Sequence, residues 1–133
     1  MRVVHRCAIA GAIIFIAAIG TATSGEGVSF SADIAPILND HCATCHVTGS
    51  EPGHMALYSE VSYQYLVGVP SEESTLKRVE PGDPERSYIV HKLNGTQVSV
   101  GGQGQPLPFG SQPLPDELQA KIRQWIALGA PNN

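Results

Sequence analysis

The sequence predicts an all-α fold of about four short helices joined by long loops. Apolar residues recur at helical spacing in several short segments, and residues that cap or stop helices bound these segments. The sequence lacks the alternation of strand-like and helical segments that would indicate a βαβ unit. Residues 23–133 are enough for one domain with a modest core, which a bound group at its centre would help to fill.

The first 22 residues have the layout of a secretory signal peptide. Arg2 and Arg6 form a basic head, an uncharged apolar run covers Ala8–Ile19, and small residues follow. This run is shorter than the roughly 20 residues that cross a bilayer as a helix. We therefore expect cleavage after Ala22, a periplasmic or otherwise exported protein, and no permanent membrane span in the mature chain.

The first helix of the mature domain is predicted from Asp33 onward. Asp33 is a suitable N-cap, because this places Pro36 in the first turn, where its missing N–H is not needed. The helix presents Ile34, Ile37 and Leu38 on one side. It is expected to end where the cysteines begin.

Two cysteines and a histidine follow this helix in the run Cys42-Ala43-Thr44-Cys45-His46. Each thiol can add across a haem vinyl group to form a thioether, and the imidazole can bind the iron as an axial ligand. We therefore expect one covalently attached haem c, held by Cys42 and Cys45, with His46 as the iron ligand. Cys7 would be removed with the signal peptide. Export agrees with this reading, because c-type haem is attached outside the cytoplasm.

Other uses of the two cysteines are less favoured. A zinc site could recruit His41 and His46, but no second ligand pair follows, and ligands from so short a run would be cramped. A thioredoxin-like dithiol lies at a strand end in a βαβ pattern, which is absent. A disulfide across two residues closes a small strained ring that stabilises little.

A middle helix is predicted over Tyr58–Val67, with Gly68 and Pro70 as its stop. The charged run Ser71–Glu80 after it is typical of a solvated connector. Lys77 and Arg78 could hydrogen-bond a haem propionate, although solvation at the surface is the favoured reading.

The next helix is predicted over Pro84–Leu93, capped by Asp83 and stopped by Asn94 and Gly95. A long irregular loop over Thr96–Pro115 follows, and a loop of this length in a compact domain is usually functional. We expect it to cover one face of the haem.

The last helix begins near Asp116 and Glu117, whose charges suit a helix N-terminus. Leu118, Ile122, Trp125 and Ile126 share one face, and Gly129 with Pro131 ends the helix. We expect Trp125 to pack in the core against the first helix.

Several segments resemble the small single-haem c-type cytochrome domains of bacterial periplasmic proteins, including the planctomycete-type cytochrome c group. The segments are Phe30–Leu38, Cys42–His46, Val79–Pro84, Ser87–Gly95 and Trp125–Ala130. The resemblance implies a cytochrome c-like fold in which the N- and C-terminal helices cross beside the haem.

One position departs from this family. Its members usually carry a Met-Pro pair before the last helix, and the methionine binds the iron opposite the histidine; here the register reads Leu107-Pro108. Met1 would leave with the signal peptide, and Met55 lies close after the anchor in sequence, which makes it a poor substitute.

Three outcomes therefore stay open for the distal side of the iron. His54 or His91 could bind it, and Gln103 or Gln105 could bind more weakly through a carbonyl oxygen. Alternatively, the iron is open or water-bound, with Leu107 and Phe109 closing an apolar pocket over it.

The favoured function is one-electron transfer between redox protein partners, without catalysis. The alternatives are a haem-based binder or sensor of small gases and a haem-bearing accessory subunit of a larger periplasmic enzyme. Without Arg2 and Arg6, six basic residues stand against twelve acidic ones, so a nucleic-acid partner is not expected.

Overall fold

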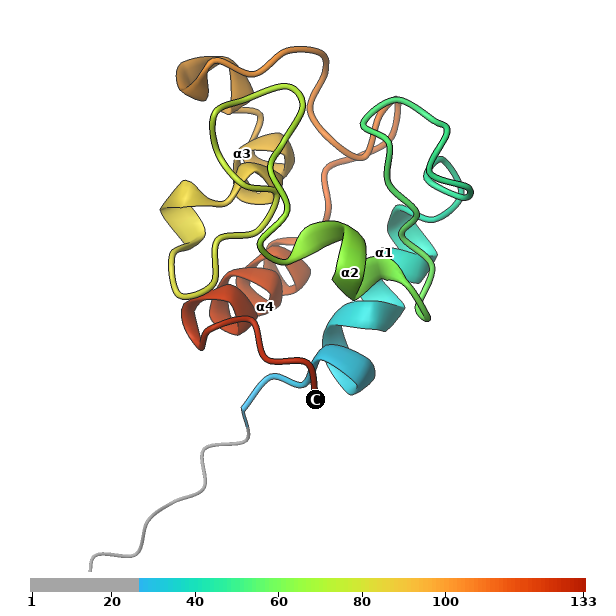
Figure 1. Cartoon of the computed structure of the whole chain (residues 1–133), viewed down its shortest axis with the longest axis vertical. Coiled ribbons are helices and arrows are strands. Elements are labelled where there is room, and N and C mark those ends of the chain that lie inside the picture. Colours follow the sequence, from blue (N-terminus) through green and yellow to red (C-terminus); the bar gives the residue numbers. More distant parts are fainter. Residues whose placement is uncertain (1–26) are drawn as a thin grey trace, which may run out of the picture.

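The computed structural model describes residues 27–133; the predicted signal peptide and Cys7 lie outside this range. Its α-helices are α1 (Ala35–His41), α2 (Ser62–Leu66), α3 (Tyr88–Asn94) and α4 (Asp116–Ala127), joined by long loops (Figure 1). Three further helical turns are η1 (Phe30–Ile34), η2 (Pro84–Arg86) and η3 (Gln97–Val100). The described residues contain isolated β-bridges but no strand, which confirms the all-α prediction. None of the helices described in this range is long and apolar enough to cross a membrane.

The first helical segment is capped by Ser29, and the predicted cap at Asp33 is wrong. The Ser29 hydroxyl accepts a hydrogen bond from the Ala32 amide at 3.3 Å, while the Asp33 carboxylate reaches back to the Ser29 amide at 2.9 Å. The two residues therefore cap the segment together, much as in a capping box. η1 is a wide π-type turn that ends two residues before Pro36, and Pro36 has no N–H to donate a helical hydrogen bond.

The segment after α2 is folded back onto the core, so its description as a solvated connector is wrong at its C-terminal end. α2 itself is shorter than predicted, and Gly68 ends it with a φ of 75°. The Arg78 amide donates to the Val69 carbonyl at 2.8 Å, and the Val79 amide donates to the Leu66 carbonyl at 3.1 Å. Val79 is fully buried.

The predicted helix over 84–93 is divided into η2 and α3 by Ser87. Asp83 caps η2 as predicted, because its carboxylate accepts from the Arg86 amide at 3.2 Å. The Ser87 side chain is buried and donates to the Asp83 carbonyl at 2.8 Å. This hydrogen bond connects the start of α3 to the start of η2 where the helix is interrupted. α3 ends at Gly95 in the left-handed conformation, as expected.

The core joins the two ends of the chain around Trp125. Its indole ring lies 5.4 Å from the Phe30 ring and 6.4 Å from the Tyr63 ring, measured between centroids, and its N–H donates to the Pro131 carbonyl at 3.0 Å. The predicted core role of Trp125 is therefore confirmed. α4 packs against η1, as predicted for the two ends of the domain, and also against α3.

Candidate functional site

The two anchor cysteines lie on the turn that continues α1. The Cys42 amide donates to the Leu38 carbonyl at 2.9 Å, and the Cys45 and His46 amides both donate to the Cys42 carbonyl at 3.1 Å. Residues three apart on such a turn point to the same side. The sequence spacing therefore becomes a pair of neighbouring thiols at the end of a helix.

Both cysteines are free thiols. Cys42 is half-buried and Cys45 is exposed. Burial raises the pKa of the Cys42 thiol to about 11, and the neighbouring Cys45 adds to the increase. Cys42 is thus a protonated thiol at neutral pH, which is the form that adds across a vinyl group.

His46 offers a neutral imidazole beside these thiols. Its Nδ1 atom is buried and has no hydrogen-bond partner. Burial is the main cause that lowers its pKa; Glu51 opposes this, and the positive charges of Arg78 and Lys92 add to it. A neutral ring with an unpartnered nitrogen suits a metal ligand, which must be deprotonated. The donor set of two thiols and one imidazole therefore fits a covalently attached haem.

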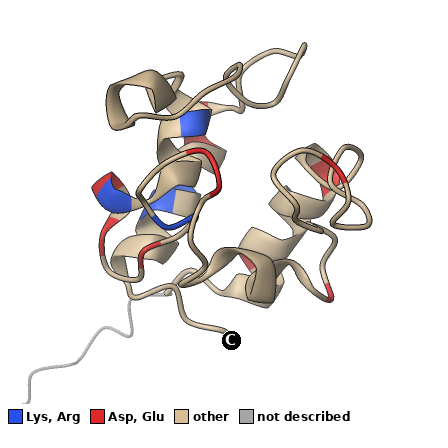
Figure 2. Ribbon diagram, turned by 45° about the horizontal axis from the view of Figure 1, so that its top comes forward, with Lys and Arg blue, Asp and Glu red and all other residues tan. Residues whose placement is uncertain are grey.

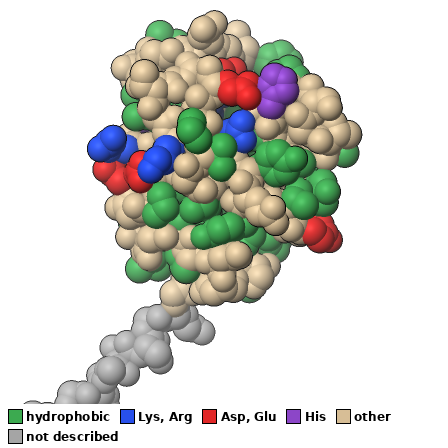
Figure 3. Space-filling model, in the orientation of Figure 1, with side chains coloured by type: hydrophobic (Ala, Val, Ile, Leu, Met, Phe, Trp, Pro, Cys, Tyr) green, Lys and Arg blue, Asp and Glu red, His purple; other side chains and the backbone are tan. Residues whose placement is uncertain are grey.

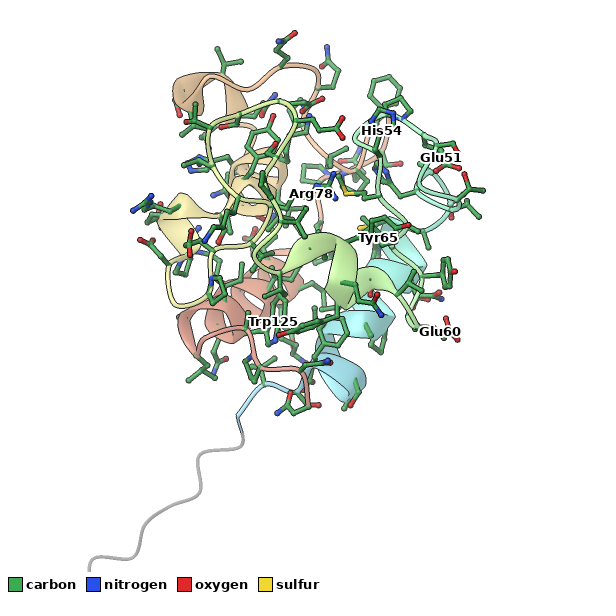
Figure 4. The ribbon with its side chains drawn as sticks, in the orientation of Figure 1. Glu51, His54, Glu60, Tyr65, Arg78 and Trp125 are labelled. Atoms are coloured by element: carbon green, nitrogen blue, oxygen red, sulfur yellow. The ribbon has the colours of Figure 1, made fainter. Side chains whose placement is uncertain are left out.

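Arg78 is buried, which corrects the expectation that it is solvated. Only 6% of the residue is exposed. Its guanidinium donates to the carbonyls of Tyr65 at 2.8 Å, Gly53 at 2.7 Å and His54 at 3.3 Å, while its Nε atom is buried without a partner. Figure 4 shows Arg78 between His54 and Tyr65, where it ties the loop after the anchor to the end of α2.

Lys92 is a second largely buried cation, on α3. Its ammonium group lies 3.3 Å from the Glu73 carboxylate and donates to the Gln103 carbonyl at 3.1 Å. Glu73 also accepts from the Tyr88 hydroxyl at 2.8 Å. These contacts tie the segment after α2, α3 and the following loop into one unit.

Hydrogen bonds occupy the ring nitrogens of His91, which was a candidate iron ligand. Its Nε2 lies 2.9 Å from the Glu85 carbonyl, which can only accept, so Nε2 donates; its Nδ1 lies 2.9 Å from the Thr96 hydroxyl. Both ring nitrogens are therefore occupied in this conformation. The structure therefore favours a hydrogen-bonding role for His91 within the fold over a role as an iron ligand.

His54 is also engaged at one nitrogen. Its Nδ1 lies 2.6 Å from a Glu72 carboxylate oxygen, and 63% of the side chain is exposed. Figure 3 shows a histidine at the surface of this face, beside an acidic side chain, and Figure 4 labels His54 in the same orientation. His54 would have to leave Glu72 and turn inward to reach a distal position.

Met55 lies close to His46, on the side of the anchor cysteines, which agrees with the expectation that it is a poor substitute for the distal methionine. Its methyl group and the Cε1 atom of His46 approach the same face of Gly53, at 2.9 Å and 3.9 Å from the position that a Cβ there would take. Because Gly53 has no Cβ, the side chains of Met55 and His46 can both approach its backbone.

The loop that was expected to cover the haem lines an open cavity of about 820 Å³. Leu107 and Phe109 line it together with Gln105 and, from α3, Leu93. The Leu107 amide donates to the Lys92 carbonyl at 2.9 Å, which attaches the loop to α3. Phe109 is 71% exposed, so it does not close the cavity as expected. The anchor residues are not among those that line this cavity.

Two buried polar residues were not singled out by the sequence. Gln97 is 3% exposed, donates to the Gly104 carbonyl at 2.9 Å and leaves its side-chain oxygen buried and unpaired. Ser62 is fully buried, and its hydroxyl has no partner. A glutamine within a Gly-rich loop carries no sequence signal for burial. Among residues 27–133, no three His, Cys, Asp or Glu side chains gather as a metal-binding group.

No family model and no curated protein matches the sequence. Among solved structures, the chain is similar to hydrazine synthase of Kuenenia stuttgartiensis, with 25% identical residues and a TM-score of 0.53. The match covers 77% of this chain and 16% of that chain. The described domain is therefore similar in fold to one segment of a much longer chain.

Proposed function

We propose that this chain is an exported c-type cytochrome that binds one haem covalently and passes single electrons between redox proteins. Cys42 and Cys45 would form the thioethers, and His46 would be the proximal ligand. A bound haem supplies an iron that exchanges one electron reversibly. The chain would bind and orient it and exclude water from one side.

The observation that carries this proposal is the anchor turn itself. Two free thiols lie one turn apart at the end of α1, and a neutral imidazole with an unpartnered nitrogen follows directly. The buried cations Arg78 and Lys92 act on His46 from the surrounding elements. The loop over 103–111 consists mainly of Gly, Gln, Pro, Leu and Phe, which supports electron transfer over acid–base catalysis.

Mass spectrometry of the protein from a host with haem-attachment machinery tests this directly. The exported protein should gain the mass of one haem and retain its colour after acid-acetone extraction. Cys42→Ala with Cys45→Ala should lose both properties, while His41→Ala, which alters a neighbouring histidine, should keep them. A haem-free wild-type protein that contains zinc would refute the proposal.

A second candidate function is a binder of small gases. The open cavity beside Leu107 and the hydrogen-bonded states of His54 and His91 favour it, because no methionine or free imidazole is poised in that part of the described chain. Rapid, complete binding of carbon monoxide to the ferrous protein would support an open iron. Absence of binding would support a filled distal site and electron transfer.

If carbon monoxide does not bind, single replacements identify the ligand. Loss of the true ligand should create a carbon monoxide site, so His54→Ala and His91→Ala separate the two histidines. The fold similarity to part of a hydrazine synthase chain supports a variant of the main proposal, in which the haem serves a larger enzyme.

A further inference from the structure

Charge is unevenly distributed between the two halves of the described chain. Residues 35–66, from α1 through the anchor to α2, are called the anchor lobe below. It contains Asp40, Glu51 and Glu60 but no Lys or Arg. Figure 2 shows acidic but no basic positions on the ribbon of this part.

Nearly all basic residues of the described domain are paired with carboxylates outside the anchor lobe. Five of the six Lys and Arg side chains within residues 27–133 lie within 4 Å of a carboxylate. The pairs are Lys77–Glu80, Arg78–Glu72, Lys92–Glu73, Lys121–Asp33 and Arg123–Glu85. None of these carboxylates belongs to the anchor lobe, so its three charges face the solvent without a cationic partner in the described residues.

Apolar side chains are exposed among these charges. Val47 is 48% exposed and Tyr58 is 38% exposed. Their backbone segments lie side by side, because the Leu57 amide donates to the His46 carbonyl at 2.8 Å. The exposed thiol-bearing residue Cys45 lies two positions before Val47.

Two of the three carboxylates lie close to these apolar residues along the chain. Glu51 accepts hydrogen bonds from the Thr48 and Gly49 amides, which fixes it in the turn after Val47, and Glu60 follows Tyr58 by two residues. Figure 4 places Glu51 and Glu60 on the same outer edge of the domain. The Glu51 amide is the main cause that lowers the pKa of its own carboxyl, with further help from Thr48 and Gly49, so this charge persists in weak acid.

We propose that this face of the anchor lobe docks a protein that presents a Lys- and Arg-rich surface. An exposed apolar centre with a charged rim is the usual anatomy of a transient protein interface, and opposite charge on the partner would speed the encounter. Because the face carries the anchor turn, docking there would bring the partner's redox centre close to the haem. This inference rests on the proposed electron-transfer function.

Electron exchange at charged electrode surfaces tests the inference without an identified partner. The holoprotein is studied by voltammetry at gold coated with amine-, carboxylate- or hydroxyl-terminated monolayers. At about 10 mM salt, we expect exchange at the amine surface to be roughly 10-fold faster than at the carboxylate surface, because unscreened charges steer association. At about 1 M salt the preference should vanish, since the Debye length is then about 3 Å.

Matched double variants locate the responsible charges. Asp40→Asn with Glu60→Gln removes two charges from the anchor lobe, whereas Asp116→Asn with Glu117→Gln removes two exposed charges from the start of α4. The first variant should lose the preference by about 3-fold or more, and the second should retain it. Equal losses in both variants, or equal rates of the wild-type protein at amine and carboxylate surfaces, would overturn the inference.

The hydroxyl surface keeps the two proposals apart. Reversible one-electron voltammetry there, without any preference for amines, would leave the cytochrome function standing and reject only the docking face. Absence of a redox response at all three surfaces would reject the electron-transfer function and the docking face with it.

Discussion

Replacing Arg78 with leucine removes the hydrogen-bond donor that holds the loop after the anchor. The substitution leaves the carbonyls of Tyr65, Gly53 and His54 without the guanidinium that now serves them. It also removes the nearby positive charge from Glu72, which lies 3.9 Å away. A leucine fills part of the space but cannot donate a hydrogen bond.

The size of the effect follows from these contacts. Two hydrogen bonds are short, and hydrogen bonds from a charged group contribute about 1.5–3 kcal/mol each. The contact with His54 is longer at 3.3 Å and adds less. Removal of the buried, unpartnered Nε atom returns about 1 kcal/mol. We therefore expect the free energy of unfolding to fall by about 2–5 kcal/mol.

Urea titration of the holoprotein, followed by circular dichroism, measures this loss. Arg78→Lys keeps the charge but cannot reach all three carbonyls, so it should lose about half as much as Arg78→Leu. Arg86→Leu is the matched control, because Arg86 is exposed, and surface substitutions usually change stability by less than about 0.5 kcal/mol. Hydrogen exchange should accelerate in the loop over 49–57 in Arg78→Leu alone. A loss equal to that of the control would refute the reasoning.

Two further substitutions test the packing and the cap. Gly102→Ala places a Cβ in a clash with the Tyr88 hydroxyl, so the free energy of unfolding should fall by about 1–3 kcal/mol in urea titrations. A Tyr88→Leu background should reduce this penalty, and an equal penalty in both backgrounds would contradict the clash. The pKa of Asp33 is lowered mainly by the hydrogen bond from the Ser29 amide and next by the hydrogen bond from Lys121. The ionised carboxylate of Asp33 therefore stabilises the fold above about pH 4, and this stabilisation is lost as the pH falls through the folded-state pKa. The stability difference between wild type and Asp33→Asn should accordingly be largest near neutrality and vanish in strong acid; a difference that does not change with pH would show that charge is not the cause.

The helices that the sequence predicted well are those with strong local signals. Asp83 and Gly95 bound the α3 region because capping and left-handed conformations depend on a few adjacent residues. The face of α4 with Ile122, Trp125 and Ile126 is buried as its periodicity predicts. The prediction placed the cap at Asp33 and missed Ser29, because a choice between two suitable caps depends on the whole first turn.

The amino-acid sequence by itself determined the all-α class, the anchor run from Cys42 to His46 and the absence of a methionine at Leu107, since each follows from residue identity and local spacing. Only the tertiary structure decided that Arg78 is buried, that His91 has both ring nitrogens occupied and that the segments of Val47 and Tyr58 lie side by side. Burial and partnering depend on segments far apart in the chain that meet only after folding. For this reason the proximal side of the proposed haem site could be predicted from the sequence, whereas its surroundings could not.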